Sequence, residues 1–168
     1  MTPEQLENER VKQNGFIDLK DDKVIRTFRG EVLAEILVSE IKVIGEFTTA
    51  DGPYIDDWFI TIMTKDHWYE LPMYAIGMDE VLTELSRKLN APLQTKFVNS
   101  TEWKTRVMYP VKLEGKALYD WVDLEPKSIW ERFRELIGFQ KSIRRSTSEV
   151  NQILDYEHRS ICQHPQSE

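Results

Sequence analysis

The chain has 168 residues, enough to bury a sizeable core within one domain. Its content of 40% hydrophobic and 30% charged residues is typical of a soluble globular protein. The formal net charge of −7 disfavours a general nucleic-acid binder or anionic-membrane binder, because both functions need a basic surface.

The N-terminal part of the sequence predicts a surface helix followed by two strands. Residues 2–14 are predicted as a short helix with little apolar content, and Gly15 can end it. Residues 16–19 and 23–29 are predicted as strands around a turn at residues 20–22.

Further strands are predicted in the next part of the chain. Residues 31–37 fit either a helical stripe or an extended strand, and we favour the strand. Residues 36–47 are rich in β-branched and aromatic side chains, which also predicts a strand. After a polar loop, residues 58–65 and 68–74 predict a two-stranded hairpin.

The first strand of this hairpin carries apolar side chains on both faces. Trp58, Ile60 and Ile62 share one face, whereas Phe59, Thr61 and Met63 share the other. We therefore expect a central strand that is covered on two sides. The helix predicted after the hairpin has an apolar stripe suited to cover a sheet. This stripe consists of Met78, Val81, Leu82, Leu85 and Leu89.

The C-terminal half is less regular. Asn90 is expected to end the helix. Strands are predicted over residues 93–98 and 105–113, and Pro110 places the second at a sheet edge or breaks it. A turn at Glu114-Gly115 is followed by an apolar, partly aromatic stretch over residues 117–122. Helices are predicted over residues 126–137 and 148–158, separated by a polar and basic stretch over residues 140–148.

These elements predict an α+β fold in a single domain over residues 1–160, with a disordered tail over residues 161–168. The expected architecture is a twisted, mostly antiparallel sheet with an amphipathic helix packed on it and with C-terminal helices.

One part of the chain resembles the strand–strand–helix unit that ends small bacterial pleckstrin-homology-like domains. This part consists of ILVSEIKVIGEF, a strand, TKDHWYELPM and an amphipathic helix. The resemblance covers about a third of the chain and implies a partial barrel as the alternative architecture. The strands expected after Asn90 depart from that pattern, because the helix usually ends the family's fold. No functional residue is carried over.

Targeting and redox features are few. The single cysteine, Cys162, excludes an internal disulfide bond. The charged N-terminal segment lacks the apolar core of a signal peptide, and no apolar run approaches the roughly 20 residues of a membrane-spanning helix. We therefore expect a cytoplasmic protein that contacts no membrane.

The acidic loop before the hairpin is the candidate chemical site. Asp51, Asp56 and Asp57 place carboxylates close together, with Glu46 nearby, and such groups can bind a divalent cation or exchange a proton. Turn formation at residues 51–53 explains the same composition without any metal.

Aromatic residues beside polar ones suggest a contact surface in the same region. Tyr54 and Trp68 are flanked by polar residues, and Trp and Tyr are enriched at interfaces. We predict a binding site that consists of Tyr54, Asp56, Asp57, His67 and Trp68. His67 is expected at the opposite end of the hairpin from the two aspartates.

The sequence lacks the common nucleotide-binding, nucleophile-elbow and zinc-protease motifs. The favoured interpretation is a non-enzymatic protein-binding or accessory module, for example an immunity-type protein that neutralises a basic toxin. The alternatives are a metal-assisted enzyme that uses the acidic loop and a pleckstrin-homology-like ligand-binding module. We expect another protein as the partner, with no nucleic acid and no cofactor.

Overall fold

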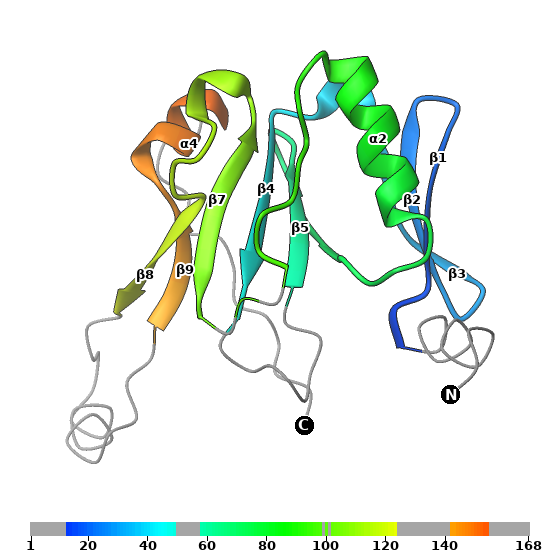
Figure 1. Cartoon of the computed structure of the whole chain (residues 1–168), viewed down its shortest axis with the longest axis horizontal. Helices are drawn as coiled ribbons and strands as arrows, with labels where there is room; N and C mark the ends of the chain where they lie inside the picture. The colour runs from blue at the N-terminus through cyan, green and yellow to red at the C-terminus, as the bar shows by residue number, and fades with distance from the viewer. Residues whose placement is uncertain (1–12, 50–57, 99, 101, 124–141, 155–168) are drawn as a thin grey trace.

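The computed structural model describes residues 13–49, 58–98, 100, 102–123 and 142–154. These residues form an α+β structure of three antiparallel sheets with two α-helices (Figure 1). Sheet B lies in the middle, sheet A and helix α2 lie on one side of it, and sheet C and helix α4 lie on the other. The predicted α+β class is confirmed, but the strands form three sheets where one twisted sheet was predicted. The described sheets are open, and α2 is followed by further strands, whereas the helix usually ends the pleckstrin-homology-like fold.

Sheet A is a three-stranded meander with the order β1–β2–β3. Its strands are β1 (Phe16–Lys20), β2 (Lys23–Phe28) and β3 (Glu31–Leu37). Asp21 and Asp22 both adopt positive φ in the turn between β1 and β2, which is the hairpin geometry that tolerates aspartate. The predicted hairpin and the favoured strand over residues 31–37 are therefore confirmed.

Sheet B has the strand order β6–β5–β4–β7, with every neighbouring pair antiparallel. Its strands are β4 (Val43–Thr48), β5 (Trp58–Met63), β6 (Trp68–Pro72) and β7 (Lys104–Tyr109). The predicted hairpin is β5 with β6. β7 is an edge strand that ends directly before Pro110, as the proline predicts.

The predicted single strand over residues 36–47 is wrong in its extent. β3 ends at Leu37, and a short 3-10 helix, η1 (Val38–Glu40), separates it from β4. The Val38 N–H donates to the Asp22 carbonyl at 2.8 Å. This turn moves the chain from sheet A into sheet B, so the two apolar segments pair in different sheets.

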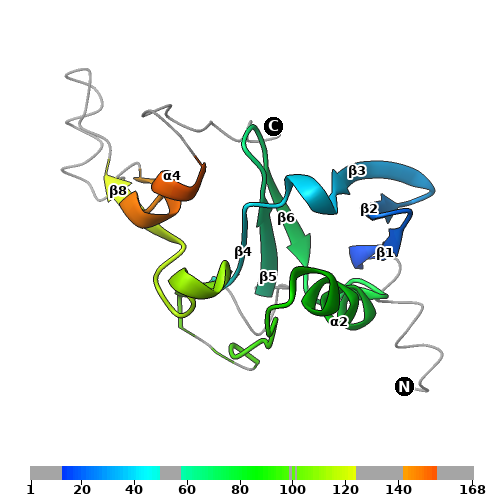
Figure 2. The same ribbon diagram turned by 90° about the horizontal axis from the view of Figure 1, so that it is seen from above.

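Helix α2 (Met78–Leu89) closes a core between sheet A and one face of sheet B (Figures 1 and 2). The predicted stripe is confirmed, because Met78, Val81, Leu82 and Leu85 are buried and Leu89 packs against them. Asn90 ends the helix in the left-handed conformation, as expected.

The close approach of α2 to sheet A depends on Gly77 at φ 90°. A Cβ at that position would lie 2.1 Å from the Ile17 carbonyl oxygen. Only glycine combines this backbone angle with so small a space.

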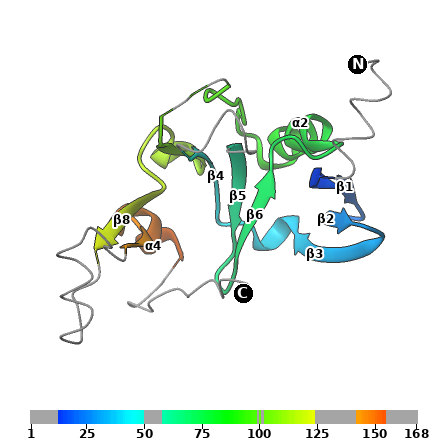
Figure 3. The same ribbon diagram turned by 90° about the horizontal axis from the view of Figure 1, so that it is seen from below.

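A second core lies on the other face of sheet B (Figure 3). It is covered by sheet C, which consists of β8 (Tyr119–Asp123) and β9 (Ser142–Ser146), and by α4 (Ser148–Leu154). Its buried residues are Val43, Phe47, Met63, Val107, Leu113, Leu118, Tyr119, Val150 and Leu154.

The two cores confirm that β5 is a central strand covered on both sides. Trp58, Ile60 and Ile62 belong to the first core, whereas Phe59 and Met63 contact the second. Because side chains alternate along a strand, the apolar residues of β5 point into the two cores on opposite faces of sheet B.

The predicted strand over residues 93–98 is wrong, since these residues pair with no strand. The polar and basic stretch, for which no element was expected, contains β9. Pro110 is followed by a 3-10 helix, η2 (Val111–Leu113), and by the expected turn at Glu114-Gly115.

Helix α4 confirms the described part of the predicted helix over residues 148–158. The predicted helix over residues 126–137, most of that over residues 2–14 and the predicted tail lie outside the described residues. Neither α-helix in the described part of the chain has the length and apolar character needed to span a bilayer.

Candidate functional site

The residues predicted from the acidic loop, Asp51, Tyr54, Asp56 and Asp57, lie outside the described residues. Among the residues that are described, no group of three or more His, Cys, Asp or Glu side chains is arranged to hold a metal ion.

His67 and Trp68 are described, and they face different surroundings. His67 is exposed in the turn between β5 and β6, and its ring stacks on Tyr69 at 5.8 Å between centroids. Tyr69 packs against the first core, whereas Trp68 packs against the second. Of the predicted binding residues that are described, Trp68 alone joins a larger cluster of aromatic side chains.

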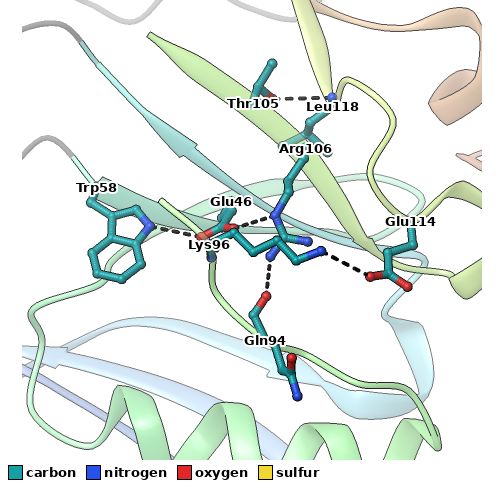
Figure 4. A network of polar contacts seen from close by, with 8 residues as sticks. All are labelled: Glu46, Trp58, Gln94, Lys96, Thr105, Arg106, Glu114 and Leu118. Atoms are coloured by element: carbon teal, nitrogen blue, oxygen red, sulfur yellow. Dashed lines mark hydrogen bonds and ion pairs between the residues drawn. The ribbon is translucent and has the colours of Figure 1, made fainter. Parts of the chain in front are cut away.

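Glu46, which the sequence placed near the acidic loop, lies at the centre of a buried polar network (Figure 4). Its Oε1 accepts hydrogen bonds from Arg106 Nε at 2.5 Å and from the Lys96 backbone N–H at 2.7 Å. Its Oε2 accepts one from Trp58 Nε1 at 3.1 Å. Arg106 also donates from Nη2 to the Gln94 carbonyl.

This network explains why residues 93–98 pair with no strand. The Lys96 N–H and the Gln94 carbonyl are bound by the side chains of Glu46 and Arg106 instead of by a neighbouring strand. Glu46 is fully buried, and its charge is matched by Arg106. The Glu46 carboxylate thus connects β4, β5 and β7 to residues 93–98, which is a structural role.

The second core contains an unusual density of rings, here called the aromatic cluster: Phe47, Phe59, Trp68, Trp103 and Tyr119. Tyr119 lies at its centre, with ring centroids 5.4 Å from Phe47, 5.5 Å from Trp68 and 5.7 Å from Trp103. The rings come from strands of sheets B and C and from the residue before β7. Next to the aromatic cluster, Trp121 is 48% exposed, and its ring centroid lies 6.1 Å from that of Trp103.

Arg144 of β9 lies against this cluster. Its Cζ atom is 5.2 Å from the ring centroid of Phe47, 5.4 Å from that of Tyr119 and 5.8 Å from that of Trp68. Its Nη1 forms an ion pair with Glu70 Oε1 at 2.6 Å. Distances of this kind allow a cation–π attraction in addition to the ion pair.

The hydrogen-bonding groups of the cluster are incompletely paired. Trp68 Nε1, Trp103 Nε1 and the Tyr119 hydroxyl are buried without a hydrogen-bond partner. Burial raises the pKa of Tyr119 well above its ordinary range, and the nearby Arg144 guanidinium opposes that rise. Burial alone lowers the pKa of Arg144, but Glu70 and Tyr119 outweigh it and hold that pKa above its usual value.

A different kind of surface lies on sheet A. Ile17, Val24 and Ile36 point into the first core, so the alternate residues point outward. The exposed apolar residues of this face, here called the outer face of sheet A, are Phe16 (45% exposed), Val32 (56%), Leu33 (50%) and Leu37 (38%).

The outer face of sheet A ends at a free sheet edge. β3 pairs with β2 and has no second strand beside it among the described residues. A shift of register between Arg26 and Thr27 leaves Leu33 as the extra residue of a bulge in β3. Phe16, Thr27 and Val32 are direct cross-strand neighbours, so a row of two apolar side chains and one threonine crosses the sheet to this edge.

Comparison of the chain with protein-family models, with curated proteins and with solved structures finds no match. The outer face of sheet A and the aromatic cluster are therefore interpreted from their own chemistry.

Proposed function

We propose that this chain is a protein-binding module and that its contact surface is the outer face of sheet A with the free edge of β3. The observation that supports this proposal is the exposure of Val32, Leu33 and Leu37 on one edge strand. Monomeric proteins rarely expose contiguous apolar patches larger than roughly a few hundred Å². An edge strand also offers unpaired backbone N–H and C=O groups, which a partner's extended segment can bind.

The charge around this edge favours a basic partner. Glu31 and Glu35 are exposed on β3, and the whole chain carries a net charge of −7. Lys23 forms an ion pair with Glu35 at 2.9 Å, which leaves Glu31 as the open carboxylate of the strand. A cytoplasmic protein that neutralises a basic toxin, as immunity-type proteins do, is one function of this class. Tyr54, Asp56 and Asp57 remain predicted contacts for the same partner.

The proposal is tested by substitution at the exposed edge. Val32→Glu and Leu33→Glu place a charge on the surface, where substitutions change the free energy of unfolding by about 0.5 kcal/mol or less. Val111→Glu is the matched control, because Val111 is 54% exposed and lies on η2, outside sheet A.

Wild-type and variant proteins are used as bait in extracts of the source organism, and the recovered partners are identified by mass spectrometry. We expect wild type and Val111→Glu to recover the same protein and the two β3 variants to lose it. Equal recovery by all four proteins would show that this surface is not the contact surface.

A further inference from the structure

We propose that the aromatic cluster together with Glu70 is a binding site for an arginine side chain, which the free protein fills with its own Arg144. The ligand class is the guanidinium group, supplied by a partner's arginine when the Arg144 side chain turns out of the aromatic cluster. This inference is independent of the proposed function, because the site lies on the face of sheet B opposite to sheet A.

The surroundings of Arg144 have the features that recognise guanidinium groups. Three rings lie within 5.2–5.8 Å of its Cζ atom, and the Glu70 carboxylate binds its Nη1 at 2.6 Å. A planar guanidinium can stack on aromatic faces and bind a carboxylate at the same time, which a lysine ammonium does less well. The side chains of Arg144 and Glu70 are 24% and 27% exposed, so the ion pair can be reached from solvent.

Arg144 reaches from β9 to sheet B, where it contacts Glu70, Phe47 and Trp68. β9 belongs to a two-stranded sheet, and its ladder partner is β8. None of the described β9 residues contributes an apolar side chain to the second core, whereas β8 and α4 contribute Tyr119, Val150 and Leu154. β9 is held to β8 by five ladder pairs and to α4 by the hydrogen bonds between Ser146 and Asn151. The Arg144 side chain can therefore leave the cluster while the ladder and the core stay in place.

The Arg144 side chain leaves two hydrogen-bond donors of the site without a partner. Arginine carries hydrogen-bond donors and no acceptor. It therefore cannot pair with the buried N–H groups of Trp68 and Trp103.

The test uses the full chain and N-acetyl-arginine amide as the probe. Arg144→Ala empties the site, and Arg145→Ala is the matched control, because Arg145 is the exposed neighbour on the same strand. Arg144→Gln is measured in parallel, in case the alanine variant does not fold. Binding is followed by tryptophan fluorescence and by the rise in Tm that a ligand of the folded state produces.

We expect saturable binding to Arg144→Ala or Arg144→Gln, and binding at least about tenfold weaker to wild type and to Arg145→Ala, where Arg144 competes. Adding Glu70→Gln to the Arg144 variant should weaken binding at least about tenfold, and N-acetyl-lysine amide should bind more weakly than the arginine probe. No saturable signal in a folded Arg144 variant would overturn the proposal. Equal binding by wild type and the Arg144 variants, or equal binding of the lysine probe, would overturn it too.

Discussion

Arg106 on β7 and Glu46 on β4 are direct cross-strand neighbours in sheet B, and Arg106 Nε donates to Glu46 Oε1 at 2.5 Å. The side chain of Glu46 is fully buried and that of Arg106 is 7% exposed. Breaking such a buried charge pair destabilises the fold, because removal of one member leaves the other charge buried without a counterion.

Arg106→Met is therefore expected to lower the free energy of unfolding by about 3–5 kcal/mol. The double variant Glu46→Gln/Arg106→Met should be markedly more stable than Arg106→Met, since it removes the stranded charge and keeps an amide oxygen as a hydrogen-bond acceptor at this position. Urea unfolding of the three proteins measures both effects. A double variant that is less stable than Arg106→Met would contradict the interpretation that the buried charge causes the loss.

Tyr119→Phe is expected to gain stability relative to wild type in alkali, because the hydroxyl that it removes is buried in the folded protein and ionises more readily when the chain unfolds. The pKa of Tyr119 is raised in the folded protein, so its contribution to stability is complete below the ordinary tyrosine pKa of about 10 and is lost as the pH rises above it. Between pH 8 and pH 11 the advantage of the phenylalanine variant should increase by about 1.4 kcal/mol. Urea unfolding at both pH values measures it, and an advantage that shrinks with pH would count against a buried hydroxyl.

Gly77→Ala is expected to be more destabilising than Gly115→Ala by about 1–3 kcal/mol. Both glycines have positive φ, so both variants experience the backbone penalty of a left-handed residue. The added methyl group meets the Ile17 carbonyl at position 77 and open space at position 115. Thermal unfolding of the two variants separates the steric effect from the backbone effect, and equal losses would show that α2 does not approach β1 as closely as described.

Leu85→Ala tests whether α2 seals the first core. Leu85 is fully buried, so its truncation should lower the free energy of unfolding by about 2–5 kcal/mol. Leu89→Ala is the control on the same stripe, because Leu89 is only partly buried and should lose clearly less. A larger loss for Leu89→Ala in urea unfolding would place the helix in a different rotation about its axis.

The elements that could be predicted from sequence are those whose pattern is local. In β5, alternating residues are apolar on both faces, and α2 has a single apolar stripe between a glycine and Asn90. These local patterns predict both the type of element and its buried face without information from the rest of the chain. The break at η1 was missed because Val38–Glu40 resembles the strands around it, and pairing partners in two different sheets decide where the strand stops.

Arg144 was missed for a related reason. Its polar neighbours gave β9 no apolar alternation, and the rings that surround it come from strands that are distant in sequence. The prediction for residues 93–98 failed in the opposite way, because a strand was expected where none forms. Their side chains alternate as in a strand, but their backbone groups bind the side chains of Glu46 and Arg106 instead of a neighbouring strand. Both errors arise from long-range polar contacts, which a one-dimensional pattern does not contain.

The contact surface on sheet A is tested most directly by hydrogen exchange of the backbone amides of β3, with and without the partner that the wild-type protein recovers. β7 serves as the internal control, because it is the edge strand of sheet B that ends at Pro110. We expect the amides of Glu31–Leu37 to exchange more slowly in the complex and those of Lys104–Tyr109 to remain unchanged. Unchanged exchange in β3 together with slower exchange in another part of the chain would contradict the proposed surface.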